Sequence, residues 1–169
     1  MKHDDIQNKI KEEDKRYADL CKVMVVMYLI LSVIYILLIV LEIVRGAKFE
    51  EVAGGICYLL SMLNFLLFFL YYNKRYRYAD YSEPVLKMLK SALKRYMPFH
   101  PSGAALIPGF LLMDAGLTLN TFKHENVMTV QIVFFGVFFA AILIGLVYWY
   151  FRYKPLTDQI KKMIKEIEN

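Results

Sequence analysis

Four long apolar segments constrain the fold of this chain more than any other feature of its sequence. A helix needs roughly 20 residues to cross ~30 Å of hydrocarbon, because it rises ~1.5 Å per residue. Within the first segment, residues 23–41 carry no charge, whereas a helix of a soluble bundle keeps a polar face. We therefore predict an all-α integral membrane protein, a four-helix bundle. The predicted transmembrane helices are residues 22–44, 52–72, 103–122 and 128–151.

The distribution of Lys and Arg predicts how these helices are oriented. Six such residues lie at or before residue 22, seven in the connection 73–102 and five in the tail 152–169, whereas the two other connections together hold three. Loops rich in Lys and Arg stay in the cytoplasm during insertion. We therefore expect an N-in/C-in topology, with both termini and the connection 73–102 in the cytoplasm, and we expect the protein in the inner (plasma) membrane of a bacterium.

The two predicted cytoplasmic arms each carry one apolar stripe. These stripes predict helices, the first of them continuous with the first transmembrane helix. Pro155 is expected at a helix start or a bend just after the fourth transmembrane helix. The stripe of residues 1–21 runs into the transmembrane helix and is Ile6, Ile10, Glu13, Tyr17, Leu20 and Met24, and that of residues 152–169 is Leu156, Ile160, Met163 and Ile167.

The connection 73–102 contains a predicted basic amphipathic helix at residues 84–97. Its apolar side faces either the anionic inner leaflet, as an interfacial helix, or the two cytoplasmic arms. At about 100° per residue, the apolar side holds Val85, Leu86, Leu89, Ala92, Leu93 and Tyr96. The opposite side holds Lys87, Lys90, Ser91 and Lys94, with Arg95 nearer the boundary. We expect Lys87, Lys90, Lys94 and Arg95 to form a surface for lipid or for a partner.

Tyrosines and basic residues alternate along residues 71–101, a pattern that also occurs where proteins bind nucleic acids. Here the tyrosines continue an aromatic belt at the membrane interface, and the lysines occupy one side of the predicted helix. We therefore expect no nucleic-acid partner. The expected partners are membrane lipids of the anionic inner leaflet and a protein on the cytoplasmic side.

The third predicted transmembrane helix carries the carboxylate Asp114. An ionised Asp deep in a membrane helix costs ~2.5–3.5 kcal/mol on insertion scales, so it should face the bundle interior, be protonated or find a partner. Counted from the outer end, Asp114, Ser61 and Asn64 lie ~12, ~14 and ~18 Å deep. We predict an intramembrane polar site of Asp114, Ser61, Asn64 and Thr118, in which Ser61 or Asn64 donates to Asp114. Such a site is either a proton or cation site or a polar clasp between two helices.

The sequence contains no motif of an enzyme, a cofactor site or a metal site. It lacks HExxH, GxSxG, a phosphate loop and GxGxxG, and His3, His100 and His124 are far apart. We therefore expect no catalytic residue, cofactor or metal. Cys21 and Cys57 are expected at different depths of the bundle, too far apart for the ~7 Å Cα separation of a disulfide.

Two functions stay open at this stage. The first is a non-enzymatic regulatory or scaffolding membrane protein, which binds a protein partner through a cytoplasmic platform made of the two arms and the helix 84–97. The alternative is a small transporter or an ion- or proton-conducting protein that uses Asp114. A membrane enzyme with His100 as its acid or base has less support, and a homo-oligomer is compatible with the sequence.

Overall fold

The computed structural model describes residues 2–97, 101–121 and 127–168, and these residues form helices joined by turns. No strand occurs within the described ranges, which confirms the all-α prediction. The helices are α1 (Lys2–Val44), α2 (Phe49–Arg77), α3 (Val85–Arg95), the 3-10 helix η1 (Pro101–Leu106), α4 (Ile107–Thr121), α5 (Val127–Arg152) and α6 (Lys154–Glu168).

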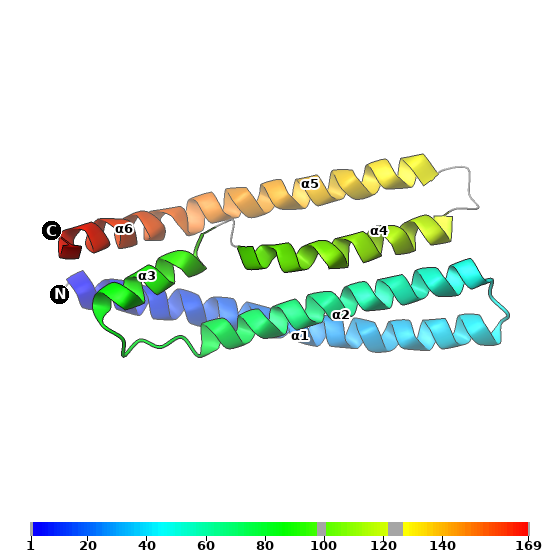
Figure 1. Cartoon of the computed structure of the whole chain (residues 1–169), viewed down its shortest axis with the longest axis horizontal. Helices are drawn as coiled ribbons and strands as arrows, with labels where there is room; N and C mark the ends of the chain where they lie inside the picture. Colours follow the sequence, from blue (N-terminus) through cyan, green and yellow to red (C-terminus); the bar gives the residue numbers. More distant parts are fainter. Residues whose placement is uncertain (1, 98–100, 122–126, 169) are drawn as a thin grey trace.

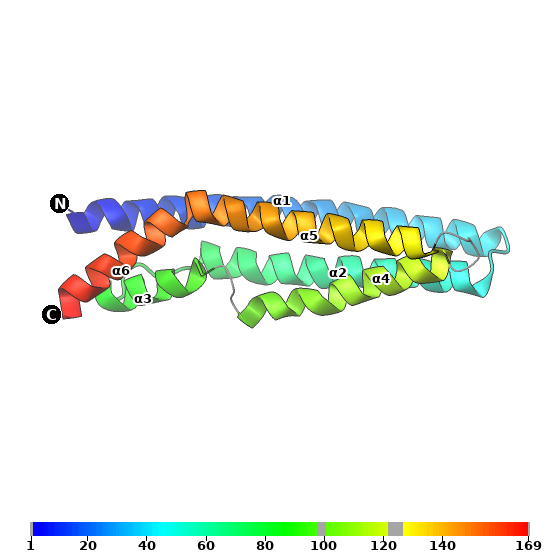
Figure 2. The ribbon, with the colours of Figure 1, turned by 90° about the horizontal axis from the view of Figure 1, so that it is seen from above.

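Four of the described helical segments are long and apolar enough to cross a membrane. They are Asp5–Val44, Phe49–Arg77, Gly103–Thr121 and Val127–Arg152, which confirms that the chain has four candidate membrane-spanning helices. These segments run along the long axis of the molecule, and both chain ends lie at the same end of it (Figure 1). The view from above shows the same arrangement, with α3 and α6 beside the first part of α1 (Figure 2).

The four long helices do not pack equally. α1 lies against α2, and α2 lies against α4, over most of their lengths, whereas α5 makes a thinner contact with α4. α5 has no buried residue at all. Many apolar side chains therefore stay exposed on the outer surfaces of these helices.

Small residues allow the close contact between α2 and α4. Gly54 of α2 and Gly116 of α4 are both buried. A Cβ atom built on Gly116 would lie 3.0 Å from the carbonyl oxygen of Gly54, which is closer than nine in ten real Cβ contacts. Glycine is therefore the residue that lets these two backbones approach.

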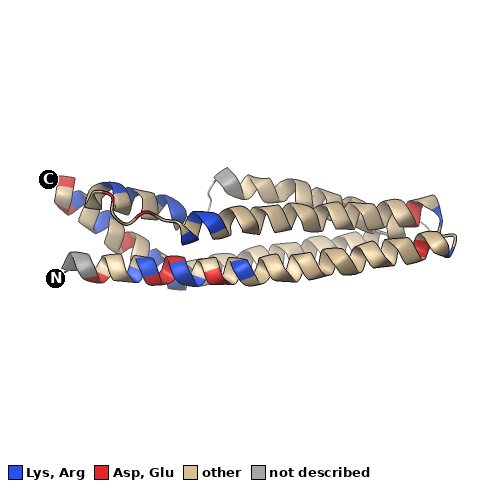
Figure 3. Ribbon diagram, turned by 90° about the horizontal axis from the view of Figure 1, so that it is seen from below, with Lys and Arg blue, Asp and Glu red and all other residues tan. Residues whose placement is uncertain are grey.

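Charged residues gather at the end of the molecule that holds both termini, with a smaller group at the turn between α1 and α2 (Figure 3). At that end, parts of α1, α2, α3 and α6 enclose a hydrophobic core. We call these parts, residues 6–21, 68–81, 85–96 and 153–164, the terminal module. Its buried apolar residues are Ile10, Ala18, Cys21, Tyr72, Tyr76, Met88, Leu89, Ala92, Tyr96, Leu156, Ile160 and Met163.

The terminal module decides where the apolar side of α3 is buried. Leu89 and Ala92 are 1% and 0% exposed inside the hydrophobic core. The structure therefore has α3 docked against the rest of the chain, and the interfacial alternative, with this side in lipid, is not the arrangement observed.

α1 runs without a break from Lys2 to Val44, but its buried stripe differs in part from the predicted one. Ile10 is buried as expected, whereas Leu20 is 53% exposed and Cys21 is buried in its place. α6 begins at Lys154 after a one-residue turn, so Pro155 lies in its first turn. Proline is tolerated there because first-turn N–H groups have no acceptor within the helix.

Candidate functional site

The candidate site is built around a buried carboxylate, Asp14, in the terminal module. Its side chain is 1% exposed. Arg95 Nη2 donates to Asp14 Oδ2 over 2.7 Å, and the Tyr81 hydroxyl donates to the same oxygen over 2.7 Å. The Tyr96 hydroxyl donates to Oδ1, also over 2.7 Å. Three donors from two other segments of the chain thus meet one carboxylate of α1.

The position of Asp14 follows from helix geometry. It lies four residues after Ile10 and four before Ala18, and both of these residues are buried. Residues four apart lie on the same face of a helix, so Asp14 interrupts the buried stripe of α1. A buried carboxylate is tolerated only when it is paired and hydrogen-bonded, and Arg95 with the two tyrosines meets that requirement.

Arg95 was predicted for the exposed basic surface, together with three lysines. Its side chain is only 10% exposed and forms the ion pair with Asp14. Arg95 therefore lies inside the terminal module rather than on its surface. The sequence did contain an indication of this burial. Arg95 is predicted at the boundary between the apolar and basic sides of the helix, and a long side chain there can turn toward the buried side.

The C-terminal end of α3 is held by donors from other helices. The Tyr76 hydroxyl of α2 donates to the carbonyl of Arg95 over 3.0 Å, and Trp149 Nε1 of α5 donates to the carbonyl of Tyr96 over 2.7 Å. The last carbonyls of a helix have no partner within it. These two bonds supply partners and tie α3 to two of the long apolar helices.

The tyrosines around Asp14 stay protonated in ordinary conditions. Burial raises the pKa of Tyr96, and the negative charge of Asp14 raises it further. Burial and its hydrogen bond to Asp14 also raise the pKa of Tyr81. Both hydroxyls are therefore permanent donors, which fits a structural cluster rather than an acid or base that exchanges protons near neutral pH.

Two further ion pairs join α5 to α1 and α3 to α6 at the terminal module. Arg152, which ends α5, pairs with Glu13 of α1. Lys90 of α3 pairs with Glu168 of α6 over 2.6 Å, with side chains 51% and 47% exposed. Exposed pairs of this kind contribute at most about 1 kcal/mol, so losing one of them costs less than removing one partner of the buried Asp14 cluster.

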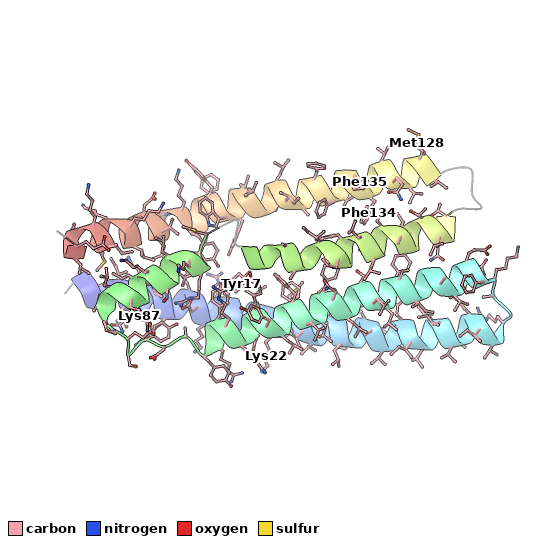
Figure 4. The ribbon with its side chains drawn as sticks, viewed as in Figure 1. Tyr17, Lys22, Lys87, Met128, Phe134 and Phe135 are labelled. Carbon is pink, nitrogen blue, oxygen red and sulfur yellow. The ribbon has the colours of Figure 1, made fainter. Side chains whose placement is uncertain are left out.

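The predicted lysine surface is present on the outer side of α3. Lys87, Lys90 and Lys94 are all exposed. Lys87 pairs with Glu83 four residues earlier, over 2.7 Å. Figure 4 shows Lys87 on α3 and Tyr17 on α1 at the end that holds the terminal module, whereas Phe134 and Phe135 belong to the unburied helix α5.

The predicted intramembrane site is divided between two helix interfaces. Ser61 donates to the carbonyl of Gly109 over 2.8 Å and not to Asp114. Asn64 also lies against Gly109, because a Cβ atom added to Gly109 would be 2.7 Å from Asn64 Oδ1. Asp114 is five residues beyond Gly109, or about 140° further around the helix at ~100° per residue. Ser61 and Asn64 therefore belong to the contact of α2 with α4, whereas Asp114 is turned away from it.

Thr118 does accompany Asp114, and α5 adds a residue that sequence reasoning missed. The Thr118 hydroxyl donates to the carbonyl of Asp114 over 2.9 Å, and Gln131 Nε2 of α5 donates to the Thr118 hydroxyl oxygen over 2.7 Å. Asp114 Oδ1 is buried without a hydrogen-bond partner among the described residues. The signal for Gln131 was its place as the one amide inside an otherwise apolar helix.

The remaining candidates add no second site. The predicted loop residues His100 and His124 lie outside the described residues. Within the described ranges, no group of three or more His, Cys, Asp or Glu could hold a metal ion. Cys21 and Cys57 are free thiols.

Comparison of the whole chain with protein-family models, with curated proteins and with solved structures finds no match. The site is therefore interpreted from its own residues and contacts.

Proposed function

We propose that this chain is a multi-pass membrane protein that acts without catalysis, as a regulatory or scaffolding protein, through the terminal module. The proposed topology is N-in/C-in, with the module on the cytoplasmic side of a bacterial inner membrane. The excess of Lys and Arg at that end supports this orientation, since 18 of the 21 Lys and Arg belong to the segments proposed to face the cytoplasm.

The observation that carries the proposal is the ion pair between Asp14 and Arg95. It joins the first part of α1 to α3, and it lies in a core that is completed by α6. The apolar stripes of the two arms and of α3 are thus packed against one another inside the chain. A partner is then recognised through charged residues on the outside of a preformed module, which makes Lys87, Lys90 and Lys94 the proposed contact surface for an acidic protein.

Co-purification from native membranes tests this proposal. In the test variant, Lys87, Lys90 and Lys94 are replaced by Glu, and we expect the partner to be lost, because the attraction becomes repulsion. In the control, Lys9, Lys15 and Lys162, which are exposed in the same part of the molecule, are replaced by Glu. The change in net charge is the same, and the partner should be retained. Retention in the test variant, or equal loss in both, would contradict the proposal.

A second candidate function, transport or conduction of protons or cations, rests on the unpartnered buried oxygen of Asp114. Ionisable groups inside a membrane often mark ion pathways. The test is flux into liposomes that contain the full chain or its Asp114→Asn variant, in which the amide replaces the ionisable group. A flux that disappears in the variant supports transport, whereas equal flux, or none in either protein, contradicts it.

A further inference from the structure

A hollow of about 360 Å³ lies where α3, α5 and α6 meet. This volume is within the range of small-ligand pockets, roughly 300–1,000 Å³. One part of its lining is apolar or aromatic and comes from Leu93, Met97 and Trp149. The other part is polar and comes from Lys154, Thr157, Asp158 and Lys161 at the start of α6.

The charged groups of the hollow are available to a ligand. Lys154, Asp158 and Lys161 follow one another at spacings of four and three, which puts them on one side of α6. Within the part of the chain that the structure describes, none of the three forms an ion pair. The ammonium of Lys154 lies 4.2 Å from the centre of the Tyr150 ring, a cation–π contact that leaves its N–H donors free for an anion.

The order of charges indicates the chemistry of the ligand. Two ammonium groups flank one carboxylate, so the set complements a ligand that carries a phosphate and an amine. A purely anionic ligand would satisfy the lysines and leave Asp158 opposed by a like charge. A purely apolar ligand would leave all three charges without a partner.

The location of the hollow indicates the source of this ligand. Trp149 lies near the end of α5, a helix of 26 residues without a buried side chain. Tryptophan is enriched at the headgroup level of membranes, where its ring is in contact with tails and its N–H is in contact with polar groups. A molecule whose polar part fills the hollow therefore has an exposed apolar helix directly beside it for its acyl chains.

We propose that the hollow binds the headgroup of a glycerophospholipid that carries a phosphate and a primary amine. The phosphate lies between the ammonium groups of Lys154 and Lys161, and the amine lies at the carboxylate of Asp158. This inference rests on the proposed membrane insertion and orientation, and it is independent of the proposed protein partner.

Native mass spectrometry of the full chain in detergent tests the site, with phosphatidylethanolamine and phosphatidylglycerol as the two probes. We expect wild type to retain phosphatidylethanolamine more strongly. Lys161→Gln should weaken its retention about fivefold, the effect of one Lys near a membrane surface. Lys162→Gln is the matched control, because Lys162 is the adjacent exposed lysine and is not part of the lining. Equal retention by these two variants would overturn the proposal.

Asp158→Asn tests the role of the amine. We expect this variant to bind the two lipids equally, because only the contact to the amine has been removed. A preference for phosphatidylethanolamine that survives in Asp158→Asn would overturn the assignment of Asp158.

Competition with soluble glycerophosphoethanolamine separates a lipid from a free phosphate compound. We expect no displacement of the lipid at millimolar concentration, since the soluble headgroup lacks the chains that contact α5. Displacement would assign the hollow to a soluble ligand and would overturn the lipid assignment. The partner experiment changes only α3, so retention of the partner in that variant would contradict the proposed function and would leave the lipid assignment unaffected.

Discussion

The terminal module and the four long helices differ in how completely their side chains are packed. In the module, four segments enclose a core in which Ile10, Leu89 and Ile160 are almost completely buried, and the carboxylate of Asp14 has three donors. Among the long helices, α2 packs against both α1 and α4, and no residue of α5 is fully buried. The comparison shows that this chain packs most completely in the terminal module, which is proposed to lie in water. Where lipid is proposed to surround it, much of the apolar surface is left open.

The largest effect is expected from removing the carboxylate at the centre of the module. Asp14→Ala leaves Arg95 buried and unpaired, which should destabilise the module by about 3–5 kcal/mol. The measurement is the alkylation rate of Cys21, which is 0% exposed, in a Cys57→Ala background. Alkylation should become much faster, because the thiol reacts when the module opens.

Asp19→Ala is the matched control for this experiment, since Asp19 is an exposed carboxylate of the same helix. Its Cys21 should react as slowly as in the parent protein. The double variant Asp14→Leu with Arg95→Met should recover slow alkylation, because an apolar pair can replace a buried ion pair. Fast alkylation in the control would contradict the central role of Asp14.

The next effect concerns the contact between α2 and α4. Gly116→Leu puts side-chain atoms where a Cβ alone would be 3.0 Å from the Gly54 carbonyl, and overpacking of this kind costs about 1–3 kcal/mol. A Cβ atom added to Gly136 of α5 would meet nothing within 4 Å, so Gly136→Leu serves as the control. The unfolding midpoint in detergent should fall for Gly116→Leu and stay the same for Gly136→Leu. Equal midpoints would remove the distinction between a packed helix pair and an open α5.

A smaller effect is expected where the two regions join. Trp149→Phe removes the donor to the Tyr96 carbonyl, at a cost of about 1 kcal/mol. Tyr148→Phe is the control, since Tyr148 is the neighbouring aromatic residue and is 52% exposed. Hydrogen exchange at the end of α3 should rise in Trp149→Phe and stay unchanged in Tyr148→Phe. Unchanged hydrogen exchange in Trp149→Phe would mean that α5 does not hold this end of α3.

The smallest effect is expected on the surface of the module. Lys90→Ala removes the exposed ion pair with Glu168, which should change stability by no more than about 1 kcal/mol. Thermal unfolding at low and high salt is the measurement, and the two curves should nearly coincide with those of the parent protein. A shift as large as that of Asp14→Ala would show that the surface, and not the buried cluster, orders the module.

The helices could be predicted from the sequence because apolar length and apolar spacing decide them. The predicted helix 84–97 is close to the observed α3, Val85–Arg95, since Pro84 suits a helix start and Leu89 and Ala92 mark a buried side. Asp14 could not be recognised in the same way. It stands in the run Glu12, Glu13, Asp14, Lys15, Arg16, where each charge alone is typical of a solvated helix.

The division of the intramembrane site illustrates another limit. Depth along the helix predicts that Asp114 is near Ser61 and Asn64, but depth carries no information about direction around the helix. That direction depends on which side of α4 contacts α2, and the buried residues Gly109 and Gly116 define that side. They are seven residues apart, which is nearly two full turns, so they lie on one side of the helix. This spacing could have predicted which side of α4 contacts α2. Asp114 falls outside that side.

The unbroken course of α1 gives the molecule a mechanical property. Its 43 residues contain no Gly or Pro, and at ~1.5 Å per residue they form a rod on the order of 65 Å long, about twice the thickness of a bilayer's hydrocarbon core. Membrane helices tilt when the thickness of the bilayer changes. A tilt of about 10° around the middle of the membrane-spanning part would move Ile10 sideways by roughly 6 Å. Because Asp14 fastens α3 to that rod, a change in membrane thickness would be converted into a displacement of the lysines on α3.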